Sequence, residues 1–161
     1  MTKSQTALIV VDMQADYIGE KSKYAYYPNT LIDKINERIA VAVKRNEIII
    51  YVKNIGKRKG KPFVSAFAEG LSIMSDFIVD KGKASVFDSI DFINILKENQ
   101  ISKVEIIGID GNCCVASSAV DASKSGLSVV FPLAYIGIKS KERFLKTRER
   151  LIKFHVEIVD C

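Results

Sequence analysis

The sequence predicts an α/β fold in which a parallel sheet carries helices on both faces. Short apolar runs alternate with stretches of helical apolar spacing, from a first run at 6–12 to a last one at 156–159. Nearly continuous apolar strands are typical of parallel sheets, because both faces of such sheets are buried. A length of 161 residues is enough for one domain with a sizeable core. No repeat or shift of composition divides the chain, so we expect one domain over residues 1–161.

The pattern indicates where the elements lie. Strands are expected at residues 6–12, 48–52, 77–79, 103–107, 127–131 and 156–159, and helices at about 30–45, 113–125 and 141–154. A further helix that ends near residue 99 could be capped by Asp88 or Ser89. We expect a tyrosine-rich loop at 13–27, a basic flexible loop at 57–61 and a short irregular helix at 63–75.

Composition narrows the possible functions. The net charge is +5, and acidic residues are interspersed with the basic ones. The charge pattern therefore does not indicate a nucleic-acid partner. No apolar run approaches membrane-spanning length, and the N-terminal run is too short for a signal peptide, so we expect a cytoplasmic protein with no membrane association. The three cysteines form no scaffold pattern. With one histidine and no C-x-x-C, a cysteine/histidine zinc site is not expected.

Three reactive side chains stand at the expected carboxyl ends of strands, where α/β folds bind their ligands. Asp12 ends the first strand, Lys81 follows the third, and Cys114 follows the fourth at the start of a helix. The helix start favours a thiolate on Cys114. Asp12 could take the thiol proton, Lys81 could stabilise both negative charges, and backbone N–H groups could hold an oxyanion. Together these parts describe acyl transfer through a thioester, with water as the final acceptor.

Each of these residues also has an ordinary structural explanation. Cys113 and Cys114 could be small buried hydrophobic residues. Asp12 could cap the turn after its strand, and Lys81 could be a solvated loop lysine. Lys83 competes with Lys81, and the mechanism alone does not choose between them.

Three blocks of the sequence carry a resemblance to a known family. Ala7–Tyr17 looks like an apolar strand followed by D-M-Q-x-D-[FY], and Lys81–Phe87 looks like K-x-x-x-S-x-F with a catalytic leading lysine. The third block fits G-x-x-[ST]-x-x-C-V-x-x-[ST]-A-x-D-A-x-x-x-G at Gly108, Cys114, Val115, Ser118, Ala119, Asp121, Ala122 and Gly126. The chain thus resembles the isochorismatase-like cysteine hydrolases, which include nicotinamidases, N-carbamoylsarcosine amidohydrolase and ureidoacrylate amidohydrolases.

The resemblance implies a three-layer α/β/α, Rossmann-like sandwich with a six-stranded parallel sheet. It also implies a catalytic triad of Asp12, Lys81 and Cys114, which selects Lys81 over Lys83 and Cys114 over Cys113. The implied activity is hydrolysis of a C–N bond in a small amide or ureide through a covalent thioester. Two alternatives stay open: vinyl-ether hydrolysis of isochorismate, which does not need the cysteine, and a non-catalytic binding subunit.

The resemblance further implies how the pocket is built. A cis peptide at Asp110–Gly111 would shape an oxyanion hole made by N–H groups around Cys113 and Cys114. Gln14 and Tyr17 would lie near the pocket and contact the substrate. The chain departs from the family at Gly111, where a threonine or serine is usual.

Cofactors and partners complete these expectations. No histidine lies between Asp12 and Lys81, where nicotinamidases carry metal ligands, so we expect no metal and no cofactor. The substrate is expected to be a small molecule, and the basic run Lys57–Lys61 could help to recruit an anionic one. A homodimer or homotetramer is expected from family habit.

Other residues have weaker assignments. We expect His155 to be structural or to be a favourable charge at a helix C-terminus, and Cys161 to be a surface thiol. Tyr24, Tyr26 and Tyr27 could line a pocket or an interface, or could pack in the core.

Overall fold

A computed structural model describes residues 5–160, so the expectation for Cys161 lies outside the described residues. The sheet follows the order β5-β2-β1-β6-β7-β9, and β8 pairs with the end of β6. All of these pairs are parallel. The strands are β1 (Gln5–Val11), β2 (Ile48–Asn54), β5 (Ile78–Lys81), β6 (Ile101–Ile109), β7 (Ser128–Pro132), β8 (Ile136–Gly137) and β9 (Glu157–Val159). The predicted α/β sandwich is confirmed, with seven strands instead of six because the two-residue β8 joins the sheet.

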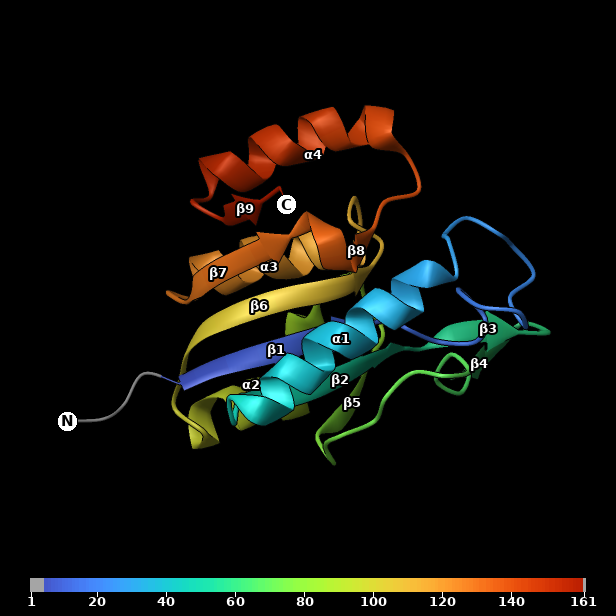
Figure 1. Ribbon diagram of the computed structural model, residues 1–161, viewed down its shortest axis with the longest axis horizontal. Coiled ribbons are helices and arrows are strands. Elements are labelled where there is room, and N and C mark those ends of the chain that lie inside the picture. The colour runs from blue at the N-terminus through green and yellow to red at the C-terminus, as the bar shows by residue number, and fades with distance from the viewer. Residues whose placement is uncertain (1–4, 161) are drawn as a thin grey trace.

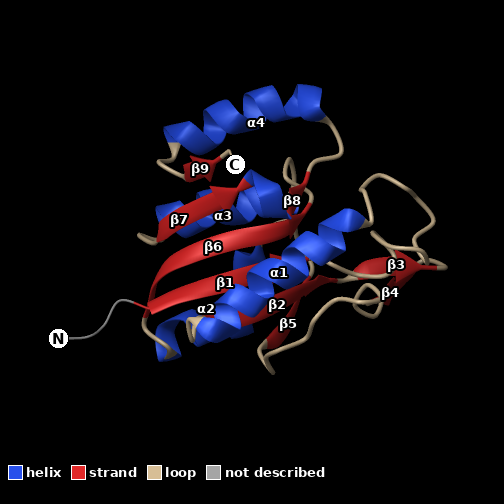
Figure 2. Ribbon diagram, in the orientation of Figure 1, coloured by secondary structure: helices blue, strands red, loops and turns tan. Residues whose placement is uncertain are grey.

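Helices cover both faces of the sheet (Figures 1 and 2). Helix α1 (Thr30–Lys44) packs on one face, and α2 (Ile90–Glu98), α3 (Cys114–Lys124) and α4 (Lys141–Lys153) pack on the other. Side chains of β1 alternate between the two cores: Ala7 and Ile9 face α3, whereas Leu8 and Val10 face α1. Two 3-10 turns, η1 (Val86–Asp88) and η2 (Leu133–Tyr135), complete the described helical segments. No helix of the described part is long and apolar enough to cross a membrane.

The strand order places the site. β1 lies between β2 and β6, so the chain winds outward in one direction towards β5 and in the other towards β9. The crevice where the winding reverses lies beyond the carboxyl ends of β1 and β6. Asp12 and the turn before α3 are found there.

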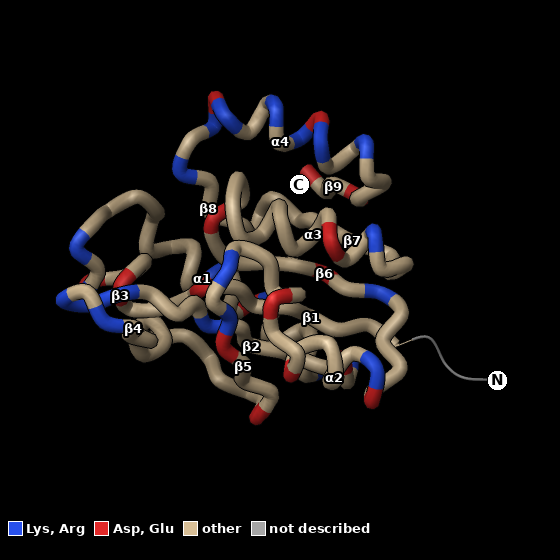
Figure 3. Tube along the Cα trace, turned by 180° about the vertical axis from the view of Figure 1, so that it is seen from behind, with Lys and Arg blue, Asp and Glu red and all other residues tan. Residues whose placement is uncertain are grey.

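Two local expectations were wrong. No helix forms in residues 63–75. The backbone of this segment bonds to residues 13–15 instead, through Ala15 N to Ala66 O at 2.8 Å and Ala68 N to Met13 O at 2.9 Å. The basic loop is an antiparallel hairpin of β3 (Gly56–Arg58) and β4 (Lys61–Phe63). Figure 3 shows Lys and Arg positions gathered on this hairpin.

Helix α2 is capped by the second of its two candidate residues. The Ser89 hydroxyl accepts a hydrogen bond from Phe92 N at 3.1 Å, which satisfies one free N–H of the first turn. His155 lies outside α4 in the turn before β9, with φ at 62°, and its side chain is exposed.

Candidate active site

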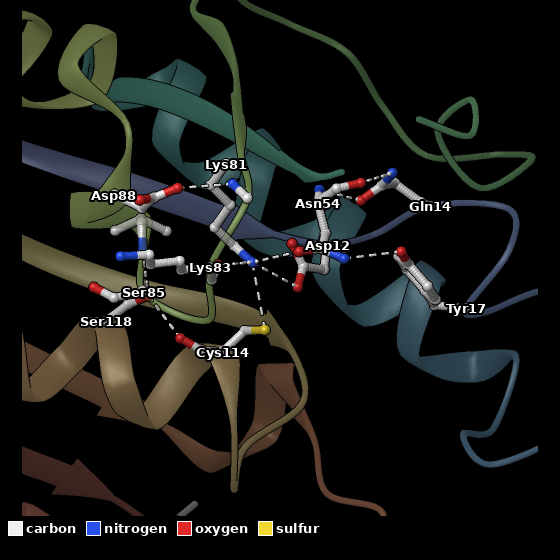
Figure 4. Close-up of polar contacts among 12 residues, drawn as sticks. Asp12, Gln14, Tyr17, Asn54, Lys81, Lys83, Ser85, Asp88, Cys114 and Ser118 are labelled. Atoms are coloured by element: carbon white, nitrogen blue, oxygen red, sulfur yellow. Dashed lines mark hydrogen bonds and ion pairs between the residues drawn. The ribbon is translucent and has the colours of Figure 1, made fainter. Parts of the chain in front are cut away.

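The structure brings Asp12, Lys81 and Cys114 together (Figure 4). Asp12 directly follows β1, Lys81 is the last residue of β5, and Cys114 is the first residue of α3. The Lys81 Nζ atom lies 3.3 Å from Asp12 Oδ2 and 3.4 Å from Cys114 Sγ. The lysine is therefore the centre of the cluster, with the carboxylate on one side and the sulfur on the other.

Lys81 is held by more than its two reactive neighbours. Its side chain is fully buried, and Nζ also donates to Asn54 Oδ1 at 3.2 Å and to Lys83 O at 3.1 Å. A buried ammonium needs such acceptors to replace its lost hydration. Lys83 contributes its carbonyl oxygen here, while its side chain is exposed. Of the two lysines, Lys81 therefore places its ammonium between Asp12 and Cys114, and Lys83 does not.

Burial governs the electrostatics of Asp12 and Cys114. It raises the pKa of Asp12 above the ordinary carboxyl value, and the positive charge of Lys81 partly opposes this rise. Burial also raises the pKa of the Cys114 thiol, and the Asp12 charge raises it further, whereas Lys81 lowers it. A carboxylate with a raised pKa is a stronger base. The buried Oδ1 atom of Asp12 has no hydrogen-bond partner among the described residues.

An amide network fixes this cluster, and its central member is a half-buried residue that the sequence did not suggest. Asn54 ends β2, accepts from Lys81 through Oδ1 and donates from Nδ2 to the Tyr17 hydroxyl at 3.0 Å. Gln14 is fully buried and accepts from Asn54 N at 2.7 Å while donating to Asn54 O at 3.2 Å. Gln14 therefore positions Asn54 from behind, and it is not among the residues that line the cavity described below. The rule that strand ends carry site residues would have found Asn54 had β2 been extended by two residues.

The turn between β6 and α3 carries the expected cis peptide, but at a different bond. The cis bond is Ile109–Asp110 and not Asp110–Gly111. The direction of the chain changes at the first bond after β6, because Gly111 N already donates to Gly137 O in β8 at 2.8 Å. Close approach of this turn to β1 needs a glycine at Gly108, where a Cβ would lie 2.2 Å from the Val11 carbonyl oxygen.

The side chain of Asp110 holds the turn together. Its Oδ1 accepts from Asn112 N at 2.7 Å, and its Oδ2 accepts from the Tyr27 hydroxyl at 2.8 Å and from Lys139 N at 2.7 Å. Burial and the charge of Asp110 raise the pKa of Tyr27, so its hydroxyl stays a donor. The backbone N–H of Cys113 donates to Asp110 O at 3.1 Å, an acceptor with which an oxyanion would compete.

Helix α3 is tied to the far side of the site. The Ser118 hydroxyl donates to Cys114 O at 2.6 Å and accepts from Val86 N at 3.0 Å. This serine therefore links the first turn of the helix to the segment that follows Lys81, which fixes the distance between the sulfur and the lysine.

These residues surround one cavity of about 270 Å³, which suits a small ligand. Its walls include the acidic residue and the thiol of the cluster, together with the tyrosines raised as pocket candidates from the sequence. The lining residues are Asp12, Asp16, Tyr17, Tyr24, Tyr26, Tyr27, Asn54, Ile109, Asp110, Cys113, Cys114 and Lys139. Lys139 and Asp16 were not singled out from the sequence.

The family model for the isochorismatase domain matches residues 6–133, which include all three clustered residues. The chain belongs to the isochorismatase family. No curated protein matches this family member at a significant level.

Solved structures share its fold. An isochorismatase-like hydrolase from Alkaliphilus metalliredigens is 24% identical with a TM-score of 0.83, covering 97% of this chain and 93% of that one. A zinc-bound pyrazinamidase from Pyrococcus horikoshii is 23% identical with a TM-score of 0.80, covering 98% and 99%. A nicotinamidase from Bacillus subtilis is 17% identical with a TM-score of 0.78, covering 97% and 99%.

The zinc in the Pyrococcus structure raises the question of whether this family member offers ligands for a metal. Within residues 5–160, no group of three or more His, Cys, Asp or Glu side chains could hold an ion. Next to Lys81, Asn54 already uses both polar atoms of its amide. The donors present therefore do not fit a zinc site, and the mechanism below passes through no metal.

Proposed function

We propose that the protein is a cysteine-dependent hydrolase that cleaves a C–N bond of a small amide or ureide. One observation carries this proposal. The Nζ atom of Lys81 lies within hydrogen-bond reach of both Asp12 Oδ2 and Cys114 Sγ. Asp12 and Cys114 also line the same cavity. A base, a cation and a nucleophile so arranged are the parts that covalent acyl transfer needs. The nicotinamidase and pyrazinamidase with the same fold act on amides, which supports the same bond class here.

The first half-reaction forms a thioester. Asp12 takes the proton from Cys114 Sγ, and the Lys81 ammonium stabilises the thiolate. The sulfur attacks the substrate carbonyl carbon, and the backbone N–H groups of Cys113 and Cys114 bind the oxyanion, that of Cys113 in place of its bond to Asp110 O. When the tetrahedral intermediate collapses, the C–N bond breaks and the amine leaves with the proton that Asp12 returns to it.

The second half-reaction frees the enzyme. Asp12 accepts a proton from water, and the resulting hydroxide attacks the thioester carbonyl. The C–S bond breaks, the acid product leaves, and the proton on Asp12 returns to the Cys114 thiolate. The raised pKa of Asp12 suits a group that accepts a proton in both halves.

The test is a panel of small amides and ureides with ammonia release as the readout. The parent protein should hydrolyse a member of the panel, and Cys114→Ala should lose at least about 10³-fold of that rate, because the nucleophile is removed. Cys113→Ala is the matched control, since it changes the neighbouring thiol and keeps the backbone N–H. An acyl adduct on Cys114 in the mass spectrum of the quenched reaction would support the thioester.

The family name keeps isochorismate as a second candidate substrate. Vinyl-ether hydrolysis needs no thiol. Hydrolysis of isochorismate by Cys114→Ala at the parent rate would therefore favour this reaction and exclude the covalent route. A folded protein that turns over neither the amide and ureide panel nor isochorismate would instead support a non-catalytic binding subunit.

A further inference from the structure

Lys139 is fixed to the turn that carries the nucleophile. It lies between β8 and α4, and its backbone N–H donates to Asp110 Oδ2 at 2.7 Å. Lys139 is one of the residues that line the cavity, together with Cys114. The position of the residue is therefore set by the same turn that sets the position of the sulfur.

An aromatic surface orients the Lys139 side chain. Its Nζ atom lies 3.8 Å from the centroid of the Tyr26 ring, and this ring stacks on Tyr24 with centroids 5.2 Å apart. A cation over an aromatic face is attracted to the ring without losing its charge. The ammonium is thus held at the cavity wall while its hydrogen-bond donors stay available.

The negative charges of the cavity already have partners. Asp12 pairs with Lys81 at 3.3 Å, and Asp16 pairs with Arg58 at 3.2 Å. The carboxylate of Asp110 accepts three hydrogen bonds. Lys139 forms no ion pair with any carboxylate in residues 5–160, so its charge is not neutralised by the protein.

The geometry points to Lys139 as the residue that binds an anionic group of the substrate, a carboxylate in the simplest case, while the scissile carbonyl lies at Cys114. This inference rests on the proposed function. A sphere of the cavity's volume is about 8 Å across, so one small molecule can contact both residues. The basic hairpin, which the sequence suggested for this role, does not line the cavity: neither Lys57 nor its neighbours in β3 and β4 belong to its walls.

Two thiol reagents that differ in charge test this inference without a known substrate. Iodoacetate is an anion and iodoacetamide is neutral. With each, the Cys114 thiolate displaces iodide, and a carbon–sulfur bond replaces the carbon–iodine bond. The readout is the ratio of the two rates at Cys114 in the full chain, with the modified sulfur located by fragment-ion mass spectrometry because Cys113 is exposed.

In Lys139→Met, the ratio of the iodoacetate rate to the iodoacetamide rate should fall about five-fold at low salt, the factor given by about 1 kcal/mol between unit charges near 4 Å in water. Lys139→Arg should keep the parent ratio. Lys57→Met, which removes an exposed lysine outside the cavity, should also keep it. In 1 M salt the difference between parent and Lys139→Met should shrink.

The outcomes separate the two proposals. If Cys114 is alkylated and the ratio in Lys139→Met stays within two-fold of the parent ratio, the role of Lys139 is overturned and the proposed function stands. If Cys114→Ala hydrolyses the amide panel as fast as the parent, the nucleophile is refuted and the inference falls with it.

Discussion

Replacing Gly111 by alanine should destabilise the protein by about 1–3 kcal/mol, the usual cost of forcing an extra methyl group into a packed interior. A Cβ atom at this position would lie 2.6 Å from Cγ1 of Ile138 and 3.0 Å from Cγ2 of Ile136. Carbon atoms make favourable contacts at 3.5–4.0 Å, so the isoleucines would have to move. Gly111 has no positive φ, so the cost comes from the collision and not from the backbone conformation.

Thermal unfolding measures this cost. For a chain of this length, each kcal/mol lowers the Tm by about 2–4 °C, so the expected fall is about 2–12 °C. Gly82→Ala is the matched control. Its Cβ would meet only Asp88 Oδ2, at an ordinary contact distance of 3.5 Å. That control should keep the parent Tm or raise it slightly, because alanine reduces the freedom of the unfolded chain.

Truncation of the colliding side chain completes the test. Ile138→Ala removes the Cγ1 atom that the new Cβ meets, so the loss in the double variant should be smaller than the sum of the two single losses by about 1 kcal/mol or more. A Gly111→Ala variant as stable as the parent would refute the reasoning. Strict additivity of the two substitutions would refute it as well, because the collision would then not involve Ile138.

Two further predictions concern charges. In Lys81→Met, the midpoint of the pH profile of Cys114 alkylation should move to higher pH, because the lysine lowers the thiol pKa. In Asp12→Asn it should move to lower pH, because the carboxylate raises the thiol pKa. Shifts of the same sign in both variants would contradict the electrostatics of the site. Arg38→Met should lower the free energy of unfolding, measured in urea, by about 3–5 kcal/mol. The buried guanidinium pairs with Glu47 and Glu105, which are largely buried and would be left unpaired. A loss below about 1 kcal/mol would show that these ion pairs contribute little.

Local sequence signals were sufficient for the main strands and helices, and the motifs of the resemblance selected Asp12, Lys81 and Cys114, which the structure brings together. The apolar run of β6, the glycine turn and the helix that starts at Cys114 lie in one continuous stretch, residues 101–124, so they could be predicted without knowledge of the fold. Asp12 and Lys81 followed because a parallel sheet brings its carboxyl ends to one edge. The helix predicted at 63–75 does not form because backbone hydrogen bonds join this segment to residues 13–15, about fifty positions away.

The supporting residues of the site could not be predicted in the same way. Gln14 stands in a motif and was expected to contact the substrate. In the structure, its side-chain amide forms hydrogen bonds with the backbone of Asn54. Nothing local in the sequence marks Asn54, because its partners come from two other segments, the loop after β1 and the end of β5. Lys139 has no motif at all, and only its contacts with Asp110 and Tyr26 place it at the cavity.

Asn54 connects two tasks of the site that are usually considered separately. Through Oδ1 it orients the ammonium of Lys81, and through Nδ2 it holds the hydroxyl of Tyr17, a wall of the cavity. One planar amide cannot turn towards a displaced Tyr17 without turning away from Lys81. A change in the shape of the cavity at Tyr17 is therefore transmitted to the ammonium of Lys81, so the cavity wall and the cluster of Asp12, Lys81 and Cys114 are coupled through a single side chain.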